Sequence, residues 1–148
     1  MVNSRNFSRV FKIKGGNFSK AGSASIETKE ILRELGVDPV IVRRAAIVAY
    51  EAEMNVVMYA DNGEMVITVN PDAIRIRLQD QGPGIKDIDA AMQEGFSTAS
   101  DEIREMGFGA GMGLPNIKKN ADVFELTTTV GKGTCYKIVI YLDSRGRT

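Results

Sequence analysis

Short stretches of the chain alternate apolar and polar side chains, and this period of two is typical of β-strands with one buried face. The strands expected from it are Phe7 to Lys14, Met65 to Val69, Ala73 to Leu78, Val123 to Val130 and Thr134 to Leu142. The turn Asn70-Pro71-Asp72 separates the second strand from the third. It predicts that these two strands pair as an antiparallel hairpin.

Other stretches place apolar residues at intervals of three and four, which is the helical period. The expected helices are Gly22 to Leu35, Asp38 to about Ala60, Asp87 to Gln93 and Leu114 to Asn120, the last with Gly111 as an alternative start. The pair Asp38-Pro39 supplies an N-cap and a proline at the first helical position of the long helix. The run Asp61-Asn62-Gly63 is expected to break the chain after that helix.

This order of elements predicts an α+β fold, a two-layer sandwich in which a mostly antiparallel sheet carries helices packed on one face. A length of 148 residues is enough for one well-buried domain and short for two. We therefore expect a single domain over residues 1–148, with its core at about 7–142.

Composition narrows the classes of function. Nineteen basic and nineteen acidic residues give a formal net charge of zero, which argues against a nucleic-acid partner. No apolar run approaches the ~18 to 20 residues of a membrane span, and the N-terminus lacks the apolar core of a signal peptide, so we expect a cytoplasmic protein without a membrane partner. With no histidine and only Cys135, a zinc site and Ser-His-Asp catalysis are disfavoured, and the chain cannot carry its own phosphohistidine.

The stretch DQGPG, at Asp80 to Gly84, follows an expected strand directly and is a candidate ligand site. Gly82 and Gly84 have no Cβ, so a flat ligand can lie against the backbone there. The Asp80 carboxylate can accept a hydrogen bond from an amine such as the exocyclic amine of adenine. Taken alone, a run of this kind is more often a plain turn.

Glu51 and Asn55 lie four residues apart in the long helix, so they share one face. Their neighbours are apolar nearly all round the helix, and burying a carboxylate and an amide there costs several kcal/mol unless a partner meets them. A hydrated Mg²⁺ with phosphates would be such a partner, since magnesium prefers oxygen ligands. The alternative is an ordinary solvated helix face.

Residues Glu94 to Gly113 are rich in glycine and serine and have no sustained period, which is typical of a functional loop or lid. Gly107, Gly109, Gly111 and Gly113 alternate along its end, directly before an expected helix. Backbone N–H groups in such a run can converge on an anion, and the helix N-terminus adds its positive end. A flexible linker is the alternative.

Taken together, four motifs carry a family resemblance. They are EAEMN at 51–55, DQGPG at 80–84, GFGAGMG at 107–113 and GKGT at 131–134. Their order and spacing resemble the asparagine box, the two glycine boxes and the final Gly-Thr box of the GHKL superfamily, whose members share the Bergerat ATP-binding fold. Within that superfamily, the segment from Gly107 to Thr134 is similar to the anti-sigma-factor serine/threonine kinases.

The resemblance implies a role for each matching residue. Glu51 would be the general base, Asn55 would ligate Mg²⁺, Asp80 would bind the adenine amine, and Thr134 would support Asp80 through water. The residues implied to contact ATP are Asp80, Gly82, Gly84, Ile85, Gly107, Gly109, Gly111, Met112, Gly113, Leu114 and Thr134.

The activity implied by the resemblance is that of a Mg·ATP-dependent serine/threonine protein kinase that phosphorylates a STAS-type (anti-anti-sigma) partner in a partner-switching pathway. A sigma factor as a further partner and a homodimer both remain open. One alternative is a non-catalytic ATP-binding anti-sigma or switch protein, and another is the ATPase module of a split histidine kinase. Glu51 favours the enzyme, because a pure nucleotide sensor needs no base.

Overall fold

The computed structural model describes residues 6–93 and 113–142, and its secondary structure confirms the α+β class. A five-stranded sheet has the order β1-β2-β3-β5-β4, and every neighbouring pair is antiparallel. The strands are β1 Phe7–Lys14, β2 Asn62–Val69, β3 Ala73–Gln81, β4 Val123–Thr129 and β5 Gly133–Tyr141. The helices are η1 Phe18–Lys20, α1 Ser23–Glu34, α2 Pro39–Tyr59, α3 Ile88–Ala91 and α5 Gly113–Asn120.

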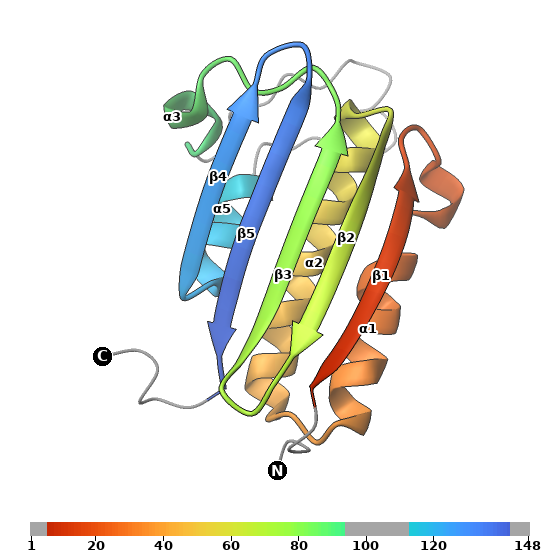
Figure 1. The fold of residues 1–148 in the computed structure, drawn as a ribbon, viewed down its shortest axis with the longest axis vertical. Helices are drawn as coiled ribbons and strands as arrows, with labels where there is room; N and C mark the ends of the chain where they lie inside the picture. Colours follow the sequence, from red (N-terminus) through yellow and green to blue (C-terminus); the bar gives the residue numbers. More distant parts are fainter. Residues whose placement is uncertain (1–5, 94–112, 143–148) are drawn as a thin grey trace.

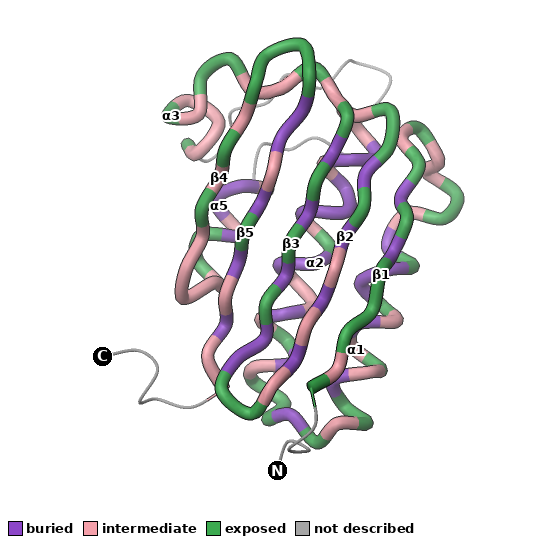
Figure 2. The backbone as a smooth tube through the Cα atoms, in the orientation of Figure 1, coloured by how far each residue is buried: buried purple, intermediate pink, exposed green. Residues whose placement is uncertain are grey.

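The molecule has two layers, with α1, α2 and α5 covering one face of the sheet (Figure 1). Buried positions alternate along β2, β3 and β5 and continue over the face of α2 that meets them (Figure 2). The largest fully buried side chains include Met65, Ile67, Ile76, Leu78 and Ile138. The other face of the sheet carries exposed polar residues, so the period of two predicted both the strands and the side on which the core lies.

The hairpin of β2 and β3 is confirmed, but both strands are longer than the sequence pattern indicated. The predicted break at Asp61-Asn62-Gly63 is confirmed only at Asp61. Asn62 and Gly63 already belong to β2, and Gly63 pairs with Asp80, through which β3 continues. This position of the ladder is a glycine because α2 crosses close above it. A Cβ at this position would lie 2.9 Å from Cγ2 of Val56.

The expected starts of the helices depend on local capping groups. The Asp38 carboxylate accepts a hydrogen bond of 2.8 Å from the Val40 N–H at the start of α2, as predicted. Asp87 caps α3 in the same way, through the Ala90 N–H at 3.0 Å, although α3 is shorter than expected. No helix in the described ranges is both long and apolar enough to span a bilayer.

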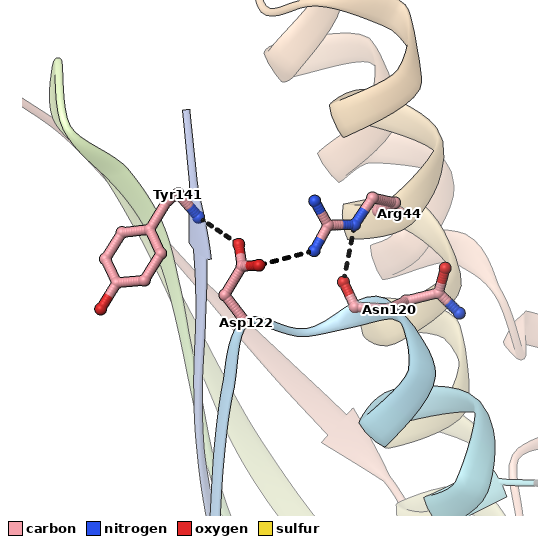
Figure 3. Close-up of polar contacts among 4 residues, drawn as sticks. All are labelled: Arg44, Asn120, Asp122 and Tyr141. Carbon is pink, nitrogen blue, oxygen red and sulfur yellow. Dashed lines mark hydrogen bonds and ion pairs between the residues drawn. The ribbon is translucent and has the colours of Figure 1, made fainter. Parts of the chain in front are cut away.

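A polar cluster joins α2 to the C-terminal end of α5 and to the sheet (Figure 3). Nε of Arg44 donates to the carbonyl of Asn120 at 2.9 Å, and the guanidinium forms an ion pair of 3.3 Å with Asp122. The other carboxylate oxygen of Asp122 accepts from the Tyr141 N–H at 2.8 Å. The cluster holds α5 against α2, and so fixes the position of the first turn of α5.

Candidate active site

Most of the site residues expected from the sequence and described by the structure gather at one end of the sandwich. β3 ends there, β5 begins there, and the last turns of α2 reach the same end (Figure 1). The candidate residues form two groups, one at the ends of the strands and one between α2 and α5.

Asp80 is the central residue of the strand group. It is 6% exposed, and its Oδ1 accepts a hydrogen bond of 2.9 Å from the Thr134 N–H. Within the described residues its Oδ2 has no hydrogen-bond donor, yet no fully buried polar side-chain atom there lacks a partner. Oδ2 is therefore not fully buried, and it can accept a hydrogen bond from the amine of a ligand.

The environment of Asp80 also affects its titration. Burial raises the pKa of the Asp80 carboxyl above its ordinary value, because a charge is costly to remove from water. The hydrogen bond from the Thr134 N–H acts in the opposite direction. A donor on a bound ligand would therefore stabilise the ionised form.

The glycine turn after Asp80 packs against the turn between β4 and β5. Gly84 has a φ of +76°, and a Cβ there would lie 2.6 Å from the carbonyl oxygen of Thr129. The Pro83 carbonyl accepts from the Gly131 N–H at 2.8 Å. Gly82 is half-buried, and a Cβ there would lie 3.0 Å from Cβ of Ala60, just after the end of α2.

Two threonines connect this turn to the sheet. The Ile85 N–H donates to Oγ1 of Thr128 at 2.8 Å, and Oγ1 of Thr134 lies 3.1 Å from that hydroxyl. The Thr134 backbone N–H donates directly to Asp80, and the contact through water that the resemblance implied stays a prediction. Thr128 was not recognised in the sequence, because a threonine in a β-strand is ordinary and carries no local signal.

The helix group begins with Glu51, which is half-buried on the side of α2 that faces α5. Its Oε2 accepts a hydrogen bond from the side-chain amide of Asn116 in α5. The described residues provide no donor to Oε1, so this oxygen is free to accept a proton or a hydrogen bond. Asn116 was also missed in the sequence analysis, where it is only one residue of the expected helix Leu114 to Asn120.

Asn55 lies one turn further along α2. Its Nδ2 donates to the Tyr136 hydroxyl at 3.2 Å, and Oδ1 has no donor among the described residues. A Cβ at Gly113 would lie 3.1 Å from this Oδ1, so the first residue of α5 must be small for α5 to approach it. An amide oxygen with no donor among the described residues can ligate a Mg²⁺ ion that is otherwise held by phosphates and water, and the adjacent helix N-terminus can meet those phosphates.

Tyr136 connects the two groups. It lies two residues after Thr134 on β5, is 2% exposed, and contacts Asn55 through its hydroxyl. Burial raises the pKa of the Tyr136 hydroxyl far above its ordinary value, so the phenol stays neutral. A neutral hydroxyl can accept from Nδ2 of Asn55, and this contact keeps Oδ1 pointing away from β5.

Glu53 has a different role, although it lies between Glu51 and Asn55 in the sequence. It is 2% exposed, and its carboxylate accepts from the backbone N–H groups of Gly22, Ala24 and Ser25 at 3.1, 3.2 and 3.1 Å. Burial raises the pKa of the Glu53 carboxyl, and the three N–H bonds oppose that rise. Glu53 therefore caps the N-terminus of α1 from the side of α2.

The rest of the expected ATP contacts lie at the start of α5 or before it. Gly113 opens α5, and the Leu114 side chain is buried in the core, so only the backbone of Leu114 is placed to meet a ligand. The other expected contacts, Gly107, Gly109, Gly111 and Met112, lie outside the described residues.

Comparisons with known proteins agree with this geometry. Residues 41–145 match the family described as "Histidine kinase-, DNA gyrase B-, and HSP90-like ATPase". The chain is 33% identical to the serine/threonine-protein kinase RsbT of Bacillus subtilis, over 77% of this chain and 83% of that one. It is 34% identical to the anti-sigma F factor of Thermoanaerobacter sp., over 73% of this chain and 77% of the relative.

A solved structure supports the fold alone. The mycobacterial sensor histidine kinase MprB superimposes with a TM-score of 0.51 at 15% identity, over 90% of this chain and 97% of that one. The sequence-based assignment to the superfamily is thereby confirmed, and so is the resemblance to its anti-sigma and serine-kinase group. The chain belongs to the family of histidine kinase-, DNA gyrase B- and HSP90-like ATPases.

Proposed function

We propose that this protein is a Mg·ATP-dependent serine/threonine protein kinase that phosphorylates a STAS-type protein in a partner-switching pathway. The names of the relatives support the class of activity. The observation that carries the proposal is the position of Glu51 on the side of α2 that faces α5. Asn116 of α5 holds its carboxylate, and Asn55 lies one turn further along α2.

Adenine is recognised at the ends of the strands. The free Oδ2 of Asp80 accepts from the exocyclic amine, and the glycine turn that follows lets the flat base lie against the backbone. Guanine carries a carbonyl where adenine carries this amine, so a carboxylate acceptor favours ATP over GTP.

Phosphoryl transfer requires charge neutralisation and alignment of the reactants. Oδ1 of Asn55 would hold Mg²⁺, which when bound supplies positive charge to the phosphates. The N-terminus of α5 adds its positive end. These contributions come from one small region, because Gly113 brings the start of α5 against Asn55.

Glu51 acts on the acceptor. As the oxygen of a serine or threonine forms a bond to the γ-phosphorus, the bond from that phosphorus to the β-phosphate oxygen breaks and ADP leaves. The hydroxyl proton passes to the free Oε1 of Glu51, while Asn116 keeps the carboxylate oriented through Oε2.

A second candidate function is a switch that binds ATP and sequesters its partner without phosphorylating it. The name of the anti-sigma F factor relative favours this function. A sigma factor would then be bound as well as, or in place of, a STAS-type protein. The open oxygen of Glu51 beside the N-terminus of α5 favours the kinase.

The experiment is a transfer assay with γ-labelled ATP and a purified STAS-domain protein from the same cells, with and without Mg²⁺. We expect Mg²⁺-dependent label on the partner that survives acid, as a serine or threonine phosphate does. A stable complex without transfer would support the sequestering switch. Acid-labile label would indicate a histidine acceptor and the split-kinase alternative.

A further inference from the structure

A groove of about 760 Å³ lies over α2, between α1 and α5. Figure 1 shows these two helices on either side of α2, and both pack against it. The α2 residues that line the groove are mostly exposed or half-buried, in contrast to Ala45, Val48 and Ala52 on the side that meets the sheet. The groove therefore opens on the side of the helical layer away from the sheet.

The rim of the groove is strongly basic. Lys29 and Arg33 lie one turn apart on α1, and Arg43 lies on α2. Among the described residues, none of these three cations takes part in an ion pair, whereas the neighbouring Arg44 is paired with Asp122. Glu51 is the only carboxylate among the described residues that line the groove. The rim thus carries positive charge without a counter-ion in this part of the chain.

The floor of the groove is apolar. It includes Ile47 and the ring of Tyr50, which is 39% exposed. Arg43, Ile47, Tyr50 and Glu51 follow one another along one face of α2, and a rise of 1.5 Å per residue gives a length of about 12 Å from the first to the last. An apolar floor with a basic rim matches an amphipathic segment that carries acidic residues beside its apolar stripe.

The end of the groove is its most informative feature. Glu51 and Asn116 line it. In the proposed function Glu51 takes the acceptor proton and Asn116 orients its carboxylate. A segment lying along the groove would therefore end beside the base. We propose that the groove is the docking site for an acidic amphipathic segment of the protein substrate, next to its acceptor serine or threonine. The identification of this segment as part of the substrate rests on the proposed function.

Docking is tested first without catalysis. The probes are two dye-labelled synthetic helical peptides of about 15 residues with the same leucine stripe, one flanked by glutamate and the other by lysine. Fluorescence anisotropy at low salt should give binding of the acidic peptide at least about tenfold tighter than that of the basic one. The double variant Arg33→Glu/Arg43→Glu should lose about tenfold or more of this affinity.

A matched control comes from the open face of the sheet. Arg75 and Arg77 are exposed and distant from the groove, so Arg75→Glu/Arg77→Glu makes the same change of net charge. It should bind the acidic peptide as the unchanged protein does. Equal binding of both peptides, or equal loss in both double variants, would overturn the docking site. If the groove variant fails a circular-dichroism check, Arg33→Gln/Arg43→Gln replaces it, with a loss of about threefold expected.

The second arm uses the STAS-domain substrate of the transfer assay. Arg33→Glu/Arg43→Glu should raise KM for this protein by about tenfold and leave kcat and ATP affinity unchanged, because docking precedes the chemical step.

If transfer proceeds but KM and peptide binding do not change, the docking site is wrong and the kinase stands. If the acidic peptide binds as expected but no partner is phosphorylated, the kinase is wrong and the docking surface stands. A self-association that is lost in the groove variant and competes with the acidic peptide would assign the groove to a second copy and overturn the proposal.

Discussion

The two sides of α2 carry the same type of side chain in opposite roles. Glu51 and Glu53 are two residues apart, which is about 200° around the helix, so one faces α5 and the other faces α1. Glu53 is buried and accepts three backbone N–H groups, whereas Glu51 is half-buried and accepts one side-chain amide. The surrounding donors, and not the residue type, therefore decide whether a carboxylate has a structural or a chemical role.

Asp80 lies between these two cases. It is buried like Glu53, but only one N–H group of the described residues donates to it, so one of its two carboxylate oxygens has no donor there. A buried carboxylate with spare capacity is costly to keep unless a ligand uses it, and this makes it a candidate binding residue. The comparison therefore predicts losses of stability on one side of the molecule and losses of binding on the other.

The largest effect on stability is expected from Glu53→Ala. The change leaves three backbone N–H groups at the start of α1 without their acceptor, and we expect a loss of about 3 kcal/mol or more in the free energy of unfolding. Urea unfolding measures it, with the exposed Glu30→Ala as the control, which should stay within about 0.5 kcal/mol. A loss no greater than that of the control would show that solvent replaces the cap.

A smaller effect, on binding alone, is expected from Asp80→Asn. The asparagine oxygen can still accept from the Thr134 N–H, so the fold is kept, but the charged acceptor for adenine is lost. ATP affinity should fall by about 1.5 to 3 kcal/mol, with Asp72→Asn as the control at the far end of the sheet. Calorimetry that finds unchanged affinity, or equal affinity for ATP and GTP, would contradict the assignment.

Tyr136→Phe should have a still smaller effect, of a more specific kind. Removal of the hydroxyl frees the Asn55 amide to rotate, so the Mg²⁺-dependent part of ATP affinity should fall by about 1 kcal/mol. Binding without Mg²⁺ should not change, and Tyr141→Phe on the same strand should alter neither quantity. A uniform loss of affinity with and without Mg²⁺ would point to a packing defect rather than to a turned amide.

The smallest effect concerns pH. The raised pKa of Glu53 means that the folded protein holds this proton above the ordinary value of 4.5, where the unfolded chain releases it. The contribution of the Glu53 carboxyl to the free energy of unfolding is therefore complete below pH 4.5 and declines as pH rises through the pKa of the folded state. Glu53→Gln should cost more stability near pH 4 than near pH 7. A greater cost near pH 7 would mean that the three N–H bonds outweigh burial and lower the pKa instead.

Much of the fold could be predicted because its signals are local. Alternation gave the strands to within a few residues, and Asp38 with Pro39 gave the start of α2. The errors arose where a contact distant in the sequence overrides local preference. The glycine at position 63 is typical of a chain break, yet Gly63 lies within β2. A glycine is needed there because Val56 on the crossing helix leaves no room for a larger residue.

The same reason limits the prediction of the site. Glu51, Asn55 and Asp80 stand in recognisable motifs, but the residues that hold them do not. Asn116 is 65 positions from Glu51, and Tyr136 is 81 positions from Asn55. Glu53 differs from Glu51 because the start of α1 lies against it, and 31 positions separate it from Gly22. Such partners become visible only when the chain is folded.

The most direct test of the central claim is the single-turnover rate of phosphate transfer by Glu51→Gln, with saturating Mg·ATP and STAS-domain substrate. If Glu51 is the base, the rate should fall by ~10² to 10⁴-fold while ATP affinity, partner affinity and melting temperature stay at wild-type values. Glu53→Gln, measured beside it, should transfer phosphate in proportion to its folded fraction. A folded Glu51→Gln protein that transfers at the wild-type rate would contradict the account and leave the sequestering switch as the better description.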